Sequence, residues 1–154
     1  LVGLTAADIA TAFPVEEVST GNNMLIVPVK TLLAIQNANG NIDHLATFFN
    51  DKSALAPYLF TLDTVNTEAS VHTRFFGPHL GILEDPATGS AAGPLVAYLL
   101  KHTLFGPSFE IKNEQGIEMG RPSMIWMKGA VKGDKYDIKI GGQCAYVGKG
   151  SFRI

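Results

Sequence analysis

The segment 90–103 places apolar side chains around almost the whole circumference of an expected helix. Only Tyr98, Lys101 and His102 remain for a polar side, and the apolar positions are Ala91, Ala92, Leu95, Val96, Leu99 and Leu100. A helix that is apolar nearly all round must be covered on most of its sides. Several short, twisted strands that curl around one helix meet this need, whereas two flat layers do not. The sequence therefore predicts an α+β fold in which a mixed, mostly antiparallel β-barrel wraps around a central α-helix.

The rest of the chain supplies the strands that such a fold requires. Helical spacing is found at 30–36 and 42–50. Hydrophobic runs or alternating patterns predict strands at 24–29, 58–62, 70–76, 109–112, 124–128, 136–140 and 145–147. Pro28 lies inside the first of these runs, which predicts an edge strand or a bulge. A length of 154 residues fits a single domain, 1–154, with one sizeable core.

Charge and cysteine content exclude several classes of function. A net charge of -2 and the lack of a Lys/Arg cluster argue against nucleic acid and anionic lipid as partners. The longest apolar run, 91–100, is about half of the ~20 residues that a membrane span needs. The single cysteine, Cys144, excludes an intramolecular disulfide framework and suits the cytoplasm, and we expect it to be a buried, inert thiol. The chain starts at Leu1 with no secretory signal, so we expect it to be a piece of a longer protein.

The loop before the central helix combines a carboxylate with a helix start. Pro86 biases Asp85 toward an extended backbone, and Gly89 permits a close approach that a side chain would block. Thr88 or Ser90 is a natural N-cap, and we expect Pro94 in the first turn, where its missing N–H costs least. The free N–H groups of a helix start bind anions such as a substrate carboxylate or an enolate, while Asp85 moves or anchors a proton. The alternative is that Asp85 and Ser90 only cap a buried helix.

The same loop carries a resemblance to a known family. Glu84-Asp-Pro-Ala-Thr-Gly-Ser-Ala-Ala92 resembles the signature of the PhzF-like (phenazine biosynthesis PhzC/PhzF) family, of the diaminopimelate epimerase fold superfamily. Further segments agree in order: Ser19-Thr-Gly21, Arg74-Phe-Phe76, Gln115-Gly116, Met119-Gly-Arg-Pro-Ser123 and Gly141-Gly142.

The resemblance implies a protein of two similar halves, each a barrel around a helix, with the active site in the cleft between them. This chain resembles the C-terminal half. Asp85 and Ser90 then correspond to catalytic residues, and the residues expected to bind substrate are Thr88, Gly89, Ala91, Gly21 and Arg74. The principal acid/base glutamate and an active-site histidine belong to the absent half. The implied activity is isomerase or epimerase chemistry without a cofactor, a proton moved on a small carboxylate-bearing metabolite, and we expect the chain to be inactive without its N-terminal half.

Several residues keep a structural interpretation beside the functional one. The histidines show no metal-ligand spacing, so no metal is expected. His72 alternates with Arg74 on one strand, which predicts a half-exposed face. Arg74 either binds a substrate carboxylate or forms an internal salt bridge with Glu84. The alternative function is a non-catalytic anion-binding or self-associating domain, and we expect a homodimer in which a second copy replaces the missing half.

Overall fold

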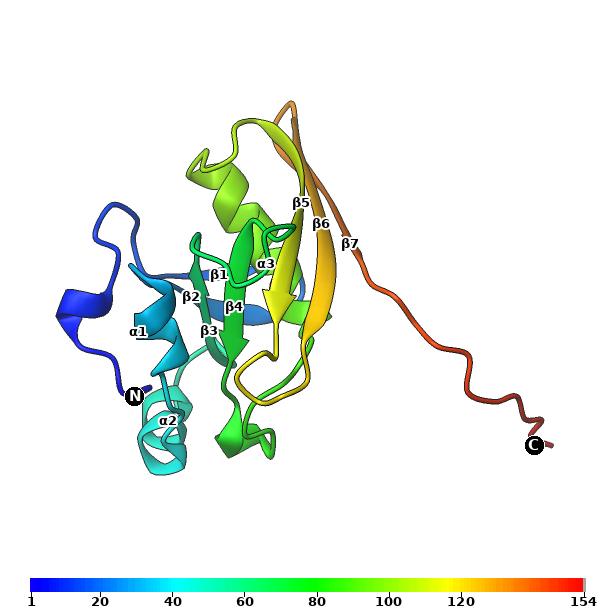
Figure 1. Ribbon diagram of the computed structural model, residues 1–154, viewed down its shortest axis with the longest axis horizontal. Coiled ribbons are helices and arrows are strands. Elements are labelled where there is room, and N and C mark those ends of the chain that lie inside the picture. The colour runs from blue at the N-terminus through cyan, green and yellow to red at the C-terminus, as the bar shows by residue number, and fades with distance from the viewer. Residues whose placement is uncertain (154) are drawn as a thin grey trace.

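The computed structural model describes residues 1–153 and contains one sheet with helices on both of its faces (Figure 1). The strands are β1 (Glu16–Ser19), β2 (Asn23–Pro28), β3 (Ala56–Thr61), β4 (Val71–Phe75), β5 (Ser108–Gln115), β6 (Ser123–Lys132) and β7 (Lys135–Gly141). The helices are α1 (Leu32–Gln36), α2 (Ile42–Phe49) and α3 (Gly89–Lys101), with short 3-10 turns at Ala6–Asp8 and Pro78–Leu80. The predicted α+β class is confirmed.

The seven strands lie side by side in the order in which they occur along the chain. The pairs β2–β3 and β4–β5 are parallel, and the other neighbouring pairs are antiparallel. Antiparallel neighbours can be joined by short turns, whereas parallel neighbours need a longer crossover. The helices α1 and α2 form the crossover from β2 to β3, and α3 forms the crossover from β4 to β5.

The directions of the strands explain why these two crossovers lie on opposite faces. The β2–β3 pair runs in one direction and the β4–β5 pair in the other. Crossovers between parallel strands are right-handed in nearly all proteins, so reversing the strands moves the crossover to the other face. Accordingly, α3 packs on one face with Tyr58 and Phe60, while α1 and α2 pack on the other with Leu59 and Phe76.

The central helix is as deeply covered as its composition predicts. All ten residues from Ala91 to Leu100 are buried, and α3 contacts β1 and β2 as well as β6 and β7. Gly129 in β6 makes this packing close, because a Cβ there would lie 2.8 Å from Cγ1 of Val96. Pro94 lies in the second turn rather than the first, since the helix begins at Gly89. The Ser90 carbonyl therefore has no Pro94 N–H as its helical donor.

Three expectations about the strands differ from the structure. Within residues 1–153 the sheet is open, because β1 and β7 are its unpaired ends, so it is a curled half-barrel rather than a closed barrel. Pro28 lies in β2, between two other strands, but it is the last residue of that strand, where a missing N–H disturbs little. The predicted strand at 145–147 is absent, and residues 142–153 extend away from the body of the molecule (Figure 1).

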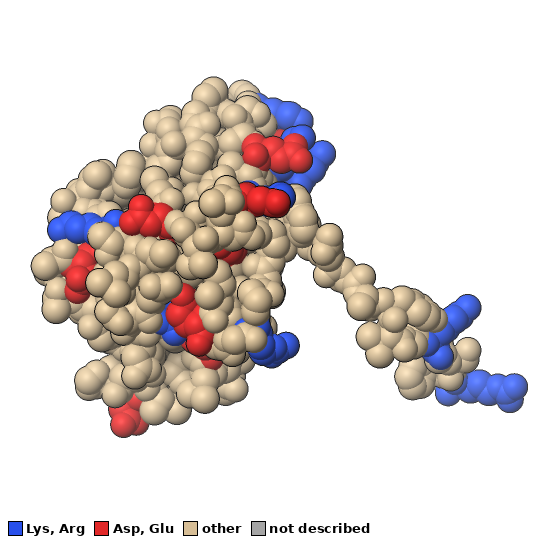
Figure 2. Space-filling view, in the orientation of Figure 1, with Lys and Arg blue, Asp and Glu red and all other residues tan. Residues whose placement is uncertain are grey.

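The surface carries no single dominant charge on the face drawn in Figure 2, where acidic and basic side chains are interspersed. Several exposed side chains of opposite sign are paired, for example Lys128 with Glu110 at 2.8 Å. Among residues 1–153, no helix has both the length and the apolar character that a membrane crossing requires.

Candidate active site

The loop before α3, residues 84–88, is called the acidic loop. A buried arginine of β4 anchors its first residue, Glu84. Arg74 Nε donates to Glu84 Oε1 at 2.7 Å and Nη2 donates to Oε2 at 2.8 Å. Nη1 donates to the carbonyl oxygens at the end of α1, those of Ile35, Gln36 and Ala38. The internal salt bridge expected as one of two alternatives for Arg74 is therefore present. Its guanidinium ties α1, β4 and the acidic loop together, and it is 6% exposed.

A side-chain hydrogen bond joins the first and last residues of the turn 85–88. Thr88 Oγ1 donates to Asp85 Oδ2 at 2.9 Å and accepts from Gln115 Nε2 at 2.8 Å. Gln115 Nε2 also donates to the Asp85 carbonyl at 2.6 Å, and the Thr88 N–H donates to Gln115 Oε1 at 3.3 Å. Thr88 is the N-cap residue of α3, but its hydroxyl serves Asp85 and not the helix N–H groups. The Asp85 carboxylate is therefore held in one orientation beside the start of α3.

Gln115 is itself fixed by a buried polar network that the sequence did not reveal. The Tyr58 hydroxyl donates to Gln115 Oε1 at 2.9 Å, and Thr73 and Asn113 complete the network. Burial raises the pKa of the Tyr58 hydroxyl, and the nearby Asp85 charge acts in the same direction, so this group remains a neutral donor. The available signal was the run of polar residues Asn113 to Gln115, directly after the strand predicted at 109–112.

A surface hollow of about 440 Å³ lies beside the first turn of α3. It is lined by Thr20, Gly21 and Asn22 between β1 and β2, by Gly89, Ser90 and Gly93 of α3, and by Ile138 and Ile140 of β7. Gly93 allows the β1–β2 turn to approach the helix, because a Cβ there would lie 2.6 Å from Thr20 Oγ1. Within residues 1–153, the N–H groups of Gly89 and Ser90 have no protein acceptor. The hollow can thus offer two amide donors and the Ser90 hydroxyl to an anion.

The predicted site residues do not all meet at this hollow. Gly21, Gly89 and Ser90 line it, while Asp85 is half-buried in the adjoining loop and is not part of the lining. Thr88 and Ala91 are buried, and the Ala91 N–H donates to the Thr88 carbonyl at 3.1 Å. Arg74 belongs to the internal ion pair with Glu84.

Two other side chains differ from their predicted environment. His72 is fully buried rather than half-exposed, because helices cover both faces of the sheet at β4 and every residue of that strand is buried. Cys144 is exposed rather than buried, since it lies in the extended segment after β7. In the part of the chain that the structure describes, no group of three or more His, Cys, Asp or Glu side chains is arranged to hold a metal ion.

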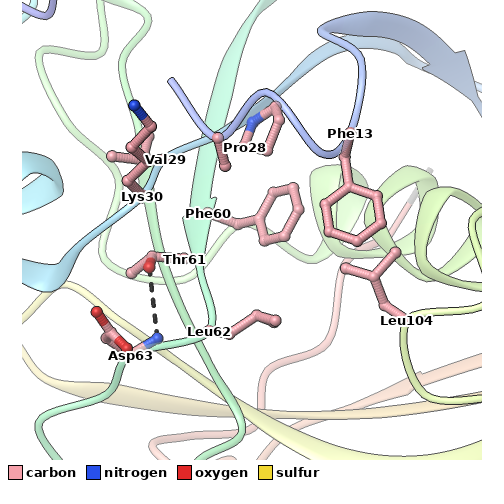
Figure 3. Close-up of a pocket in the computed structure, with 10 residues that line it drawn as sticks. Phe13, Pro28, Val29, Lys30, Phe60, Thr61, Leu62, Asp63 and Leu104 are labelled. Atoms are coloured by element: carbon pink, nitrogen blue, oxygen red, sulfur yellow. Dashed lines mark hydrogen bonds between the residues drawn. The ribbon is translucent and has the colours of Figure 1, made fainter. Parts of the chain in front are cut away.

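A second, smaller cavity of about 110 Å³ lies away from the acidic loop (Figure 3). The side chains of Phe13, Phe60 and Leu104 point toward one another across it, and Lys30 and Asp63 lie at its rim. Its lining is mostly apolar and includes none of the predicted site residues. The geometry therefore places the candidate active site at the larger hollow, next to Asp85.

Comparison with known proteins gives a consistent set of relatives. The family model described as phenazine biosynthesis-like protein (PhzC-PhzF) matches residues 1–150. An uncharacterized isomerase of Clostridium acetobutylicum is 30% identical over 96% of this chain and 50% of its own length. The trans-2,3-dihydro-3-hydroxyanthranilate isomerase of Pseudomonas aeruginosa is 29% identical over 90% of this chain and 47% of its own length.

Solved structures agree with these relatives. A Bacillus anthracis phenazine biosynthesis protein of the PhzF family superposes with a TM-score of 0.81 at 28% identity, covering 92% of this chain and 49% of that one. A predicted epimerase from Pseudomonas aeruginosa gives a TM-score of 0.69 at 34% identity, covering 92% of this chain and 45% of that one. The chain spans about half the length of the curated relatives that it matches.

Proposed function

This chain belongs to the PhzC-PhzF family of phenazine biosynthesis-like proteins, and we propose that it is the C-terminal half of a cofactor-independent isomerase or epimerase. In this proposal it moves a proton on a small carboxylate-bearing metabolite together with an N-terminal half. Relatives named as isomerases or as a predicted epimerase support the class of reaction.

One observation carries the proposal, the hollow that brings Gly21 together with Gly89 and Ser90. Two N–H groups without protein acceptors at the start of a 13-residue helix favour a negatively charged group, because the helix dipole adds to their hydrogen bonds. They would hold a substrate carboxylate or stabilise the charge of an enolate as a proton leaves. The hydroxyl of Ser90 is exposed beside them as a third donor.

Asp85 supplies the second part of the proposed chemistry. Its Oδ2 accepts from Thr88 Oγ1 at 2.9 Å, which fixes the carboxylate next to the hollow without neutralising it by an ion pair. A carboxylate in that position holds or relays a proton at the edge of an anion site. The principal acid/base group belongs to the other half in this proposal, so we expect the isolated chain to bind a carboxylate and not to turn it over.

Exposed apolar side chains support the idea that another polypeptide segment covers this chain. Tyr146, Val147 and Phe152 lie in the extended segment 142–153 and are almost fully exposed. Burial of these side chains against another polypeptide would remove apolar surface from water. We propose the N-terminal half as the natural cover. The alternative cover is a second copy, which would give a homodimer. The alternative function is a non-catalytic domain that binds small anions or self-associates.

A two-part experiment tests the proposal. In the first part, anthranilate is titrated into the ¹⁵N-labelled chain, and we expect shifts of the Gly21, Gly89 and Ser90 amide signals and weaker binding in Ser90→Ala. In the second part, the N-terminal half is supplied and deuterium incorporation from D₂O into trans-2,3-dihydro-3-hydroxyanthranilate is measured. Asp85→Asn should slow this exchange by at least about 100-fold.

The matched control is Asp51→Asn, which changes an exposed carboxylate in the turn after α2. If Asp85→Asn behaves like Asp51→Asn in both binding and exchange, the catalytic interpretation is wrong. The mass of the chain in solution distinguishes the alternative, since a stable dimer that binds anthranilate but gives no exchange with the N-terminal half favours the self-associating domain.

A further inference from the structure

A cluster of buried charges lies on the α1 face of the sheet, apart from the hollow. His72 is the least expected member, because it is fully buried and both of its ring nitrogens face carboxylates. Nδ1 lies 2.8 Å from Glu114 Oε1, and Nε2 lies 3.2 Å from Glu118 Oε1. A neutral imidazole has a single N–H, so an arrangement with a carboxylate at each nitrogen fits the doubly protonated, charged ring.

The carboxylates of Glu114 and Glu118 differ in how many partners they have besides His72. Glu114 Oε1 also accepts from the Val65 N–H at 2.6 Å, and Oε2 accepts from the Asn66 N–H at 2.8 Å. For Glu118, no residue within 1–153 makes a hydrogen bond to either side-chain oxygen. Its 3.2 Å contact with Nε2 is an ion pair without the in-line geometry of a hydrogen bond. Glu118 therefore relies on the charge of His72.

The other charges that face this pair belong to β4 and the acidic loop. Arg74 Nε lies 3.8 Å from Glu118 Oε2, but it is engaged by Glu84 at 2.7 Å. Burial works against the imidazolium, yet the carboxylates of Glu118 and Glu114 outweigh this effect and raise the pKa of His72. Burial also works against the charge of Glu118, but His72 and, more weakly, Arg74 lower its pKa below the usual value. Both members of the pair are therefore stabilised in their charged forms.

The turn that carries Glu118 touches the acidic loop directly. It runs through residues 116–121 and is closed by the Arg121 N–H, which donates to the Gly116 carbonyl at 2.9 Å. A Cβ on Gly116 would lie 2.9 Å from both Cα and O of Pro86, so the two backbones are in close contact. The preceding residue, Gln115, donates to the Asp85 carbonyl. A displacement of this turn therefore changes the positions of Asp85 and Thr88.

We propose that Glu118 is a positioning residue that, through its ion pair with His72, holds the turn 116–121 against Pro86 and thereby keeps the acidic loop in place. Loss of the imidazole proton leaves the half-buried Glu118 carboxylate with only Arg74, which lies 3.8 Å away and is already engaged by Glu84. A poorly compensated buried charge is unfavourable. The turn then moves so that Glu118 reaches water, and the contact with Pro86 loosens. The site geometry is thus linked to the protonation of a histidine that never touches substrate. This inference rests on the proposed function only in treating the acidic loop as part of the site.

The test is an NMR titration of the ¹⁵N-labelled chain between pH 5 and pH 10, without any ligand. In the unmodified chain we expect the His72 ring to remain charged above its ordinary range. The amide signals of Gly116, Gly89 and Ser90 should shift with the same midpoint as the ring. Glu118→Gln keeps the size of the side chain and removes its charge. It should lower the His72 midpoint and speed hydrogen exchange of the amides in 116–121 by about tenfold at neutral pH.

Glu110→Gln is the matched control, because Glu110 lies on β5, is exposed and pairs with Lys128 at 2.8 Å. It should change neither the His72 midpoint nor the exchange of the turn. The proposal is overturned if the His72 ring titrates while the Gly116 and Ser90 signals stay fixed, or if the ring is already neutral at pH 7. The titration of the unmodified chain decides this even if Glu118→Gln does not fold. Failure of anthranilate to bind would count against the proposed function and would leave the coupling between His72 and the turn standing.

Discussion

Removing the Arg74 guanidinium is the perturbation whose effect the structure defines best. Arg74→Met keeps most of the side-chain stem but removes the guanidinium, whose carbon lies 4.7 Å from the centroid of the Phe76 ring. The substitution removes both bonds to Glu84 and all three bonds to the carbonyl oxygens at the end of α1. The Glu84 carboxylate and the α1 carbonyls are then left without their donor, in places where water has limited access.

The expected cost follows from these lost partners. Breaking a buried ion pair by removing one member costs roughly 3–5 kcal/mol. The Glu84 side chain is 14% exposed, so water restores part of its solvation and the lower end of that range applies. Orphaned carbonyls add about 1 kcal/mol each when they stay dry, but the short helix α1 can shift to expose them. We therefore expect a loss of about 3 kcal/mol, a large share of the roughly 5–15 kcal/mol that stabilises a domain.

Urea unfolding, followed by the fluorescence of the single tryptophan, Trp126, measures this loss. Lys128→Met is the matched control, because it also exchanges a cation for Met, but in an exposed ion pair with Glu110. It should leave the midpoint almost unchanged. Arg74→Lys should fall between the two, since an ammonium cannot span Glu84 and α1 together. If Arg74→Met destabilises the chain no more than Lys128→Met does, the guanidinium is not the tie between α1 and the acidic loop.

Three further predictions concern the helix, the turn and pH. Leu95→Ala, at a fully buried position of α3, should lower the free energy of unfolding by about 2–5 kcal/mol, and a urea midpoint equal to that of the unmodified chain would contradict the packing described above. Gly116→Ala should disturb the amide signals of the acidic loop far more than Gly120→Ala. Both glycines have positive φ, but only a Cβ at position 116 would collide with backbone, at the Arg121 carbonyl oxygen. Equal effects of the two substitutions would show that φ alone matters. The raised pKa of His72 contributes to the free energy of unfolding. This contribution is complete below the ordinary His value of 6.5 and is lost as the pH rises through the folded-state pKa. The lowered pKa of Glu118 contributes stability that is lost as the pH falls through the folded-state pKa of Glu118. Thermal unfolding of the unmodified chain minus that of His72→Gln should therefore give a difference that shrinks at alkaline pH, and a difference that grows there would reverse the sign of the argument.

The central helix was predictable because its signal is local. An apolar run with Pro and Gly only near its start predicts a buried helix, and α3 is found at Gly89–Lys101. The strand at 24–29 and the helix at 42–50 followed from periodicity in the same way, and they correspond to β2 and α2. In each case the residues that decide the structure are neighbours in the sequence.

The environment of buried polar residues was not predictable in this way. An alternation such as that of His72 and Arg74 is typical of a strand with one wet face, and only the crossover through α1 and α2 makes that face dry. Gln115 reaches Asp85 across a separation of 30 residues, through the parallel pairing of β4 with β5. Such contacts depend on which strands become neighbours, and the periodicity of a single segment does not contain that information.

Because each strand lies beside the one made just before it, the sheet can grow from one end as the chain leaves the ribosome. Antiparallel neighbours can pair as soon as their turn has formed, whereas β5 must wait until all of α3 has been synthesised. The helix then lies against β1 and β2 before β6 and β7 exist to cover its other side. During synthesis β1 and β2 thus cover one side of the apolar surface of α3 first. The β6–β7 hairpin then covers the other side.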